Sequence, residues 1–160
     1  MIASIKKVEQ GWIAQFERQL NHSVEETWSW LTDNEKLMKW FPELQVGGLQ
    51  EGGFMQFDMQ NGTFEKLSIT ELNPNSVLEF DWWAYSVRFE IIPEAEGCQL
   101  ILKERIETIT DHTPKDLAGW HLCLDVIKAL MDGQSIEWRA EEWKKWYEEY
   151  VKHVNALGTK

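Results

Sequence analysis

The hydrophobic pattern of the C-terminal third predicts a long helix that is covered on two sides. At about 100° per residue, its large apolar side chains fall on one broad arc. The arc consists of Leu117, Trp120, Cys123, Leu124, Ile127, Leu130 and Met131. Beside it are a narrow polar stripe (His121, Asp125, Lys128) and a smaller face (Ala118, Leu122, Ala129). We expect this helix to follow Pro114, to end at Gly133, and to bury its arc against another layer.

The N-terminal part predicts one strand followed by two short helices. Residues 12–20 alternate, which places Trp12, Ala14, Phe16, Arg18 and Leu20 on one face of a strand. Ser23 and Glu26 have the spacing of a helix capping box, and a second helix over 34–41 is expected to stop at Pro42. The first ten residues are interpreted as a short polar lead.

The middle of the chain, residues 44–106, predicts a β-meander of five or six strands. Gly-Gly pairs, Asn61-Gly62 and Asn73-Pro74 mark its turns. Three of its strands have the following inward sets: Leu78, Phe80 and Trp82; Val87, Phe89 and Ile91; Leu100, Leu102, Glu104 and Ile106. Since no helix connects these strands, the partner of the long helix should be an antiparallel sheet.

Two charged residues, Arg18 and Glu104, interrupt otherwise apolar strand faces. A lone buried charge is costly, so we expect the two side chains to lie close together and to form a salt bridge. The alternative is that they orient a polar group of a ligand.

The last helix, from about Trp138, has an aromatic face that needs a partner. Trp143, Trp146, Tyr147 and Tyr150 recur at spacings of three and four residues. A contiguous aromatic stripe usually marks an interface. We expect this helix to dock on its own domain, with a homodimer through the same helix as the alternative.

Composition limits the classes of partner. The 160 residues suit one globular domain, and a net charge of −11 disfavours nucleic acid and anionic membranes. No apolar run resembles a signal peptide or a membrane span, so a cytoplasmic protein is expected. Cys98 and Cys123 lack metal or disulfide spacing and are interpreted as idle thiols, and the histidines and carboxylates show no metal-binding repeat. No cofactor is expected.

Several segments together resemble a known superfamily. VEETWSWLTDNEKLMKWF, EGGFMQF, ITELNPNSVLEFDW and GWHLCLDVIKALMDG are similar, in this order over about residues 12–133, to motifs of the SRPBCC (START-like) superfamily. The branch they resemble most is a bacterial family similar to the C-terminal domain of activators of the heat-shock chaperone ATPase. The resemblance implies an α+β helix-grip fold, in which a curved antiparallel sheet of about six or seven strands surrounds the long C-terminal helix and leaves a cavity, as in birch-pollen-allergen relatives. The whole chain, 1–160, would form one such domain, with a core of about 12–133 and an extra helix of about 138–156.

Three function classes follow from this interpretation. We favour a carrier or sensor of a small, mostly hydrophobic ligand, since apolar pockets with a few polar groups are typical binding sites. The expected cavity lining is Arg18, Phe80, Trp82, Phe89, Glu104, Trp120 and Leu124. The alternatives are an enzyme of the polyketide-cyclase or hydrolase kind, using Arg18, Glu104 or His121 in acid-base work, and a chaperone-interaction module. A structural or surface role is preferred for His121, and no catalytic residue is assigned.

Overall fold

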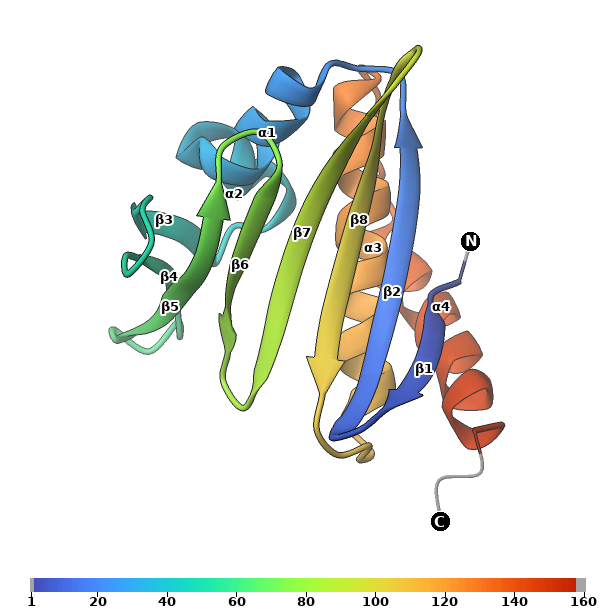
Figure 1. The fold of residues 1–160 in the computed structure, drawn as a ribbon. Coiled ribbons are helices and arrows are strands. Elements are labelled where there is room, and N and C mark those ends of the chain that lie inside the picture. The colour runs from blue at the N-terminus through green and yellow to red at the C-terminus, as the bar shows by residue number, and fades with distance from the viewer. Residues whose placement is uncertain (1, 158–160) are drawn as a thin grey trace.

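The computed structural model describes residues 2–157, and in this part of the chain one eight-stranded antiparallel sheet is combined with four helices (Figure 1). The strand order across the sheet is β1-β2-β8-β7-β6-β5-β4-β3. The strands are β1 Ser4–Val8, β2 Gly11–Leu20, β3 Leu44–Gly48, β4 Phe54–Asp58, β5 Phe64–Asn73, β6 Val77–Trp82, β7 Tyr85–Glu94 and β8 Gly97–Ile106. The helices are α1 Val24–Thr32, α2 Asn34–Trp40, α3 Thr113–Met131 and α4 Arg139–Asn155.

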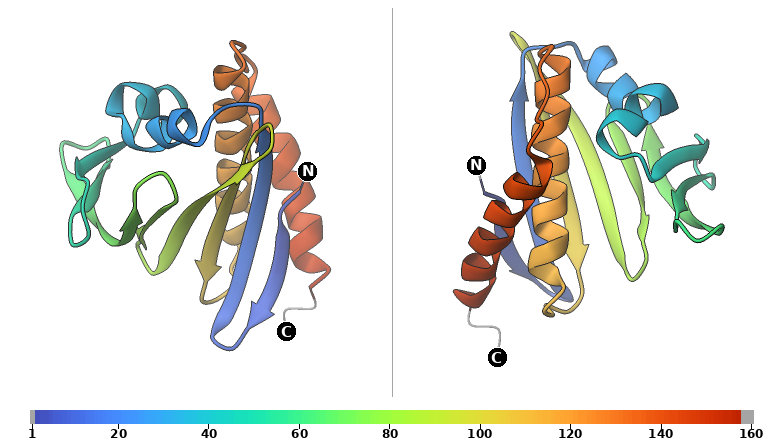
Figure 2. Two further views of the ribbon diagram at one scale, coloured as in Figure 1. Left: turned by 45° about the horizontal axis from the view of Figure 1, so that its top comes forward. Right: turned by 180° about the vertical axis from the view of Figure 1, so that it is seen from behind.

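The sheet curves around α3, which runs along its concave face (Figures 1 and 2). Trp120 is 2% exposed and Ile127 is fully buried, as expected for side chains between helix and sheet. The prediction that the apolar arc of this helix faces the sheet is therefore confirmed. The short helices α1 and α2 follow β2 and lie toward the β3 end of the sheet, where Leu31 and Leu37 join the same core.

Alternation of apolar and polar residues explains the three central strands. Phe16 on β2 lies opposite Leu102 on β8, which lies opposite Phe89 on β7. All three side chains are buried, while their neighbours along each strand point to the convex face. The inward sets predicted for β6, β7 and β8 are those found in the core, with Trp82 partly exposed at the end of β6.

The strand β1 was not predicted, because its sequence SIKKV was interpreted as a polar lead. It pairs with β2 at the edge of the sheet, and Lys6 and Lys7 are exposed. Edge strands commonly carry lysine, since charge there opposes pairing with other chains. The sheet consequently has eight strands in place of the six or seven expected.

The helix α4 docks on its own domain, beside α3 and close to β1 (Figure 2, right). Tyr150 is fully buried and Val154 is 5% exposed. The expected docking of the C-terminal helix on its own domain is thus confirmed. Trp146 stacks on His121 with ring centroids 3.8 Å apart, so α4 covers part of the polar stripe of α3.

Within residues 2–157, no helix is both long and apolar enough to cross a membrane.

Candidate functional site

Two adjoining hollows open beside the N-terminal half of α3, and we call them together the aromatic cleft. They share Trp82, His112 and Asp116. The first, of about 300 Å³, is completed by Trp83, Ala84 and Tyr85. The second, of about 380 Å³, is completed by Phe41, Lys115, Gly119, Trp120, Cys123 and Trp143. Volumes of this size are at the lower end of those that hold small molecules.

Aromatic rings form a continuous wall from the cleft to the core. The ring centroids of Trp82 and Trp120 lie 5.0 Å apart, and Phe41 lies 5.5 Å from Trp120 and 5.9 Å from Trp82. Deeper in the core, Phe89 lies 6.0 Å from Trp120 and 6.4 Å from Phe80. Most of these pairs meet edge to face, which is one of the arrangements that packed aromatic rings prefer.

Two carboxyl groups lie on the inner side of this wall. Asp116 lines both hollows, and its Oδ1 accepts a hydrogen bond from Trp82 Nε1 at 3.2 Å. Glu104, on the inward face of β8, is fully buried. In the described part of the chain, neither Glu104 oxygen nor Asp116 Oδ2 receives a hydrogen bond from an N–H donor. Burial raises the pKa of Glu104 well above its usual range, and a hydrogen bond to Asp116 together with the negative charge of Asp116 raises it further.

Local sequence places Asp116 and Trp83 at this point. The helix α3 begins at Thr113 with Pro114 in its first turn, where a missing N–H costs nothing. Asp116 falls in the same turn, where a negative charge is favoured by the helix dipole. Trp83, in the turn after β6, adopts a φ of 56° and is 46% exposed. A bulky residue with positive φ is uncommon, and such strain is concentrated at functional sites.

The predicted salt bridge between Arg18 and Glu104 is wrong. On the paired strands Arg18 lies opposite Leu100 and Glu104 opposite Ala14, four residues further along the ladder. Because a strand rises about 3.3 Å per residue, the two side chains lie well apart along the strands and face different points along the length of α3. Arg18 Nε instead donates to Asp125 Oδ1 at 2.9 Å, and Glu104 lies next to Asp116. Each inward charge therefore has its own aspartate on α3.

A second polar cluster lies under α4 and is built around His121. Its Nδ1 is 2.7 Å from the Tyr150 hydroxyl, which also accepts a hydrogen bond from the Ala3 backbone N–H at 2.9 Å. Its Nε2 lies 3.3 Å from Asp125 Oδ2. Burial lowers the pKa of His121, although Asp125 opposes this shift. His121 is fully buried and links α3 to Tyr150 and Trp146 of α4, so of the structural or surface role preferred for it the structure shows a buried, structural position.

The structure places the predicted cavity-lining residues in three different environments. Trp82 and Trp120 line the aromatic cleft, and Glu104 lies behind it next to Asp116. Phe80, Phe89 and Leu124 are at most 1% exposed and belong to the packed core. Arg18 belongs to the cluster around Asp125 and does not line the cleft.

Sequence reasoning missed Asp116, Phe41 and Trp143 as neighbours of the cleft. A signal for Asp116 was present, because it precedes Trp120 by four residues and side chains at that spacing share one face of a helix. Phe41 and Trp143 come from the end of α2 and from α4, and only the tertiary fold brings them to α3.

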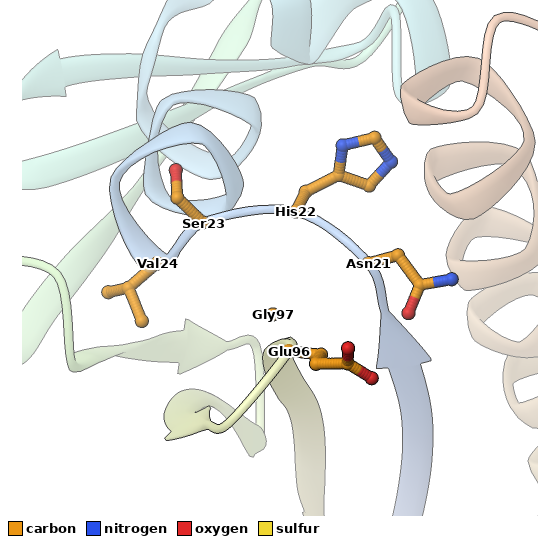
Figure 3. A pocket seen from close by; sticks show the side chains of 6 residues that line it. All are labelled: Asn21, His22, Ser23, Val24, Glu96 and Gly97. Carbon is orange, nitrogen blue, oxygen red and sulfur yellow. The ribbon is translucent and has the colours of Figure 1, made fainter.

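A separate hollow of about 730 Å³ lies at the far end of the sheet, between the β2–α1 connection and the β7–β8 turn (Figure 3). Its lining is Asn21, His22, Ser23, Val24, Glu96 and Gly97. It is open to solvent and has little apolar wall, and His22 is held 2.8 Å from Asp132 at its edge. Among residues 2–157, no three His, Cys, Asp or Glu side chains are placed to hold a metal ion, here or elsewhere. The aromatic cleft is therefore the stronger candidate site.

The fold defines the class of protein. A curved antiparallel sheet closed over a long C-terminal helix is the helix-grip arrangement of SRPBCC-type domains. Residues 21–132 match the family described as "Activator of Hsp90 ATPase homolog 1-like protein", and the chain belongs to this family. No curated protein matches the chain in sequence.

Solved structures agree with this assignment. A conserved protein of unknown function from Enterococcus faecalis is 24% identical, with a TM-score of 0.87 over 97% of this chain and 91% of its own. CalU16 from Micromonospora echinospora is 19% identical, with a TM-score of 0.66 over 94% of both chains. The Aha1 dimer from Colwellia psychrerythraea is 18% identical, with a TM-score of 0.62 over 72% of this chain and 92% of its own. At these identities the likeness concerns the fold.

Proposed function

We propose that the protein binds a small, mostly hydrophobic molecule in the aromatic cleft, as a carrier or sensor. The observation that carries this proposal is a hollow of about 380 Å³ with walls formed by Phe41, Trp82, Trp120 and Trp143 and a single acidic group, Asp116. Pockets with mostly apolar walls and a few polar groups are the usual form of small-molecule sites. The fold alone supports no particular ligand, because the same fold carries many functions.

Gly119 adds to this support. It lies in the middle of α3, where glycine costs about 1 kcal/mol relative to alanine. A Cβ atom at this position would meet nothing within 4 Å, so packing does not require the glycine. Its side of the helix opens into the cleft, and the missing side chain leaves that space free.

The test is a titration of the protein with a panel of small aromatic and aliphatic compounds, in which binding is monitored by tryptophan fluorescence. Material isolated under native conditions would be analysed by mass spectrometry for co-purifying small molecules. We expect saturable binding that changes the emission of the cleft tryptophans. Gly119→Leu should abolish it by filling the hollow, whereas Ala140→Leu, a similar enlargement at an exposed position of α4, should not. Binding that is unaffected by Gly119→Leu would contradict the proposal.

An enzyme of the cyclase or hydrolase kind is a second candidate, favoured by one observation. The pKa of Glu104, which lies next to Asp116, is raised by burial, and a carboxyl group with a raised pKa can act as a general acid. Turnover of a bound compound that is lost in Asp116→Asn would favour the enzyme. Saturable binding without turnover would favour the carrier.

The family description suggests a third candidate, a module that acts on the Hsp90 chaperone. Co-purification of the chaperone with the protein would support it. The Colwellia relative is described as a dimer, and a homodimer through the half-buried aromatic residues of α4 is an arrangement that light scattering would detect.

A further inference from the structure

The chemistry of the aromatic cleft points to the charge of its ligand. The cleft is bordered by the rings of Phe41, Trp82, Trp120 and Trp143. The face of an aromatic ring carries partial negative charge and attracts cations, most strongly in tryptophan. A wall of this composition accepts both apolar groups and an alkyl-substituted cation.

The acidic group of the cleft has no cationic partner. Asp116 receives a hydrogen bond from Trp82 at Oδ1, and the fully buried Glu104 carboxyl lies within hydrogen-bond reach behind it. The Oδ2 of Asp116 is buried and receives no hydrogen bond from an N–H donor in the described part of the chain. No arginine or lysine forms an ion pair with either carboxyl group among residues 2–157. This differs from Asp125, which is neutralised by Arg18 at 2.9 Å.

The other charged groups of the cleft do not neutralise the negative charge of Asp116. Lys115 and His112 line the cleft, but both are exposed, and water screens their charge. The net charge of the chain, −11, adds a long-range preference for cations over anions. A carboxylate or phosphate ligand would have to place its negative charge next to the Asp116 carboxylate between apolar walls, which is unfavourable.

We propose that the cleft takes an apolar molecule that carries a cationic amine. Its apolar part would lie against Trp82 and Trp120, and its ammonium group would lie at Asp116. This inference rests on the proposed function and specifies the class of ligand for the same site. The ammonium would supply the positive charge that Asp116 lacks as a partner, and the aromatic rings would surround its alkyl substituents.

Three probes with one carbon skeleton test the proposal on the unmodified protein: naphthylmethylammonium, naphthylmethanol and naphthoate, titrated at neutral pH by calorimetry. We expect affinity to fall in that order, with the cation bound about 10- to 100-fold more tightly than the alcohol, as for a hydrogen bond to a charged group. If the alcohol or the carboxylate binds as tightly as the cation, the ligand class is wrong while the proposed function stands. If none of the three binds, and the wider panel of apolar compounds also fails, both proposals are wrong.

Two matched variants distinguish the effect of the Asp116 carboxylate on affinity from the effect of the net charge of the protein. Asp116→Asn should remove the advantage of the cation over the alcohol and leave the affinity for the alcohol within about twofold. Asp111→Asn changes the net charge equally at an exposed position outside the cleft, and should leave the advantage in place. Equal losses in both variants would overturn the role of Asp116. Should Asp116→Asn not fold, the comparison of the three probes on the unmodified protein still decides the ligand class.

Discussion

At the scale of single residues, Glu104 couples the stability of the protein to pH. Burial and the adjacent Asp116 carboxylate raise the pKa of Glu104, so the folded protein keeps a proton that the unfolded chain releases. A group with a raised folded pKa contributes stability that is present below its unfolded pKa, about 4.3 for glutamate, and is lost as pH rises through the folded pKa. While only the folded state holds this proton, each unit rise in pH lowers the free energy of unfolding by up to about 1.4 kcal/mol.

Glu104→Gln should remove this dependence, because glutamine has nearly the same shape and no proton to lose. The free energy of unfolding, measured by chemical denaturation at several pH values between about 5 and 8, should fall less steeply for the variant than for the unmodified protein. Glu107→Gln, at an exposed position just after β8, is the control and should follow the unmodified protein. Parallel curves for Glu104→Gln and the unmodified protein would show that Glu104 is ionised in the folded state.

Gly119 is a position where stability and ligand binding are expected to oppose each other. Gly119→Ala should raise the free energy of unfolding by about 1 kcal/mol, since alanine is the better helix former and its Cβ meets no other atom within 4 Å. The same methyl group narrows the hollow next to Trp120, so affinity for apolar ligands should fall. Thermal denaturation with and without ligand measures both effects. A destabilised variant would show that the helix is more tightly surrounded at this position than the structure indicates.

At the scale of elements, Tyr150 fastens α4 to the N-terminal segment and to α3. Its hydroxyl binds the Ala3 backbone and His121 on α3. Tyr150→Phe leaves two buried polar groups without a partner and should lower the free energy of unfolding by about 1 to 3 kcal/mol. Tyr147→Phe is the matched control, because the Tyr147 ring stacks on Trp143 and the described hydrogen bonds do not include its hydroxyl. Equal effects of the two changes would mean that the buried hydrogen bonds contribute little.

Elements with a strong period were predictable from the sequence, and pairings between them were not. The alternation in β2, β7 and β8 correctly placed Phe16, Phe89 and Leu102 inside, because a period of two leaves only one way to bury the apolar set. The short, polar β1 has no such pattern and was missed. Arg18 and Glu104 were correctly assigned to the inner face, but their partners depend on strand register and on the level of α3, which no local pattern specifies.

At the scale of the whole molecule, the aromatic cleft exists only after folding has brought distant segments together. Its walls come from the end of α2, the β6–β7 turn, α3 and α4. The sequence identified Trp82 and Trp120, because both lie on predicted inward faces of long elements. Trp143 was assigned to a docking face without a known partner, so its place beside the cleft depended on how α4 crosses α3. The C-terminal helix therefore contributes both to stability and to the candidate site.

Removal of residues 134–160 tests this double role. The shortened chain loses the burial of Tyr150 and Val154 and exposes His121, so its free energy of unfolding should fall by at least about 3 kcal/mol, the cost of deleting one buried aromatic side chain. Light scattering should give the mass of a monomer before and after truncation, since the buried face of α4 is used within the chain. Trp138→Ala in the full chain is the control, because Trp138 is 71% exposed and its loss should leave stability unchanged. A truncated protein with an unchanged melting temperature would contradict the docking of α4, whereas a dimer that becomes a monomer would assign the helix to an interface between two copies of the chain.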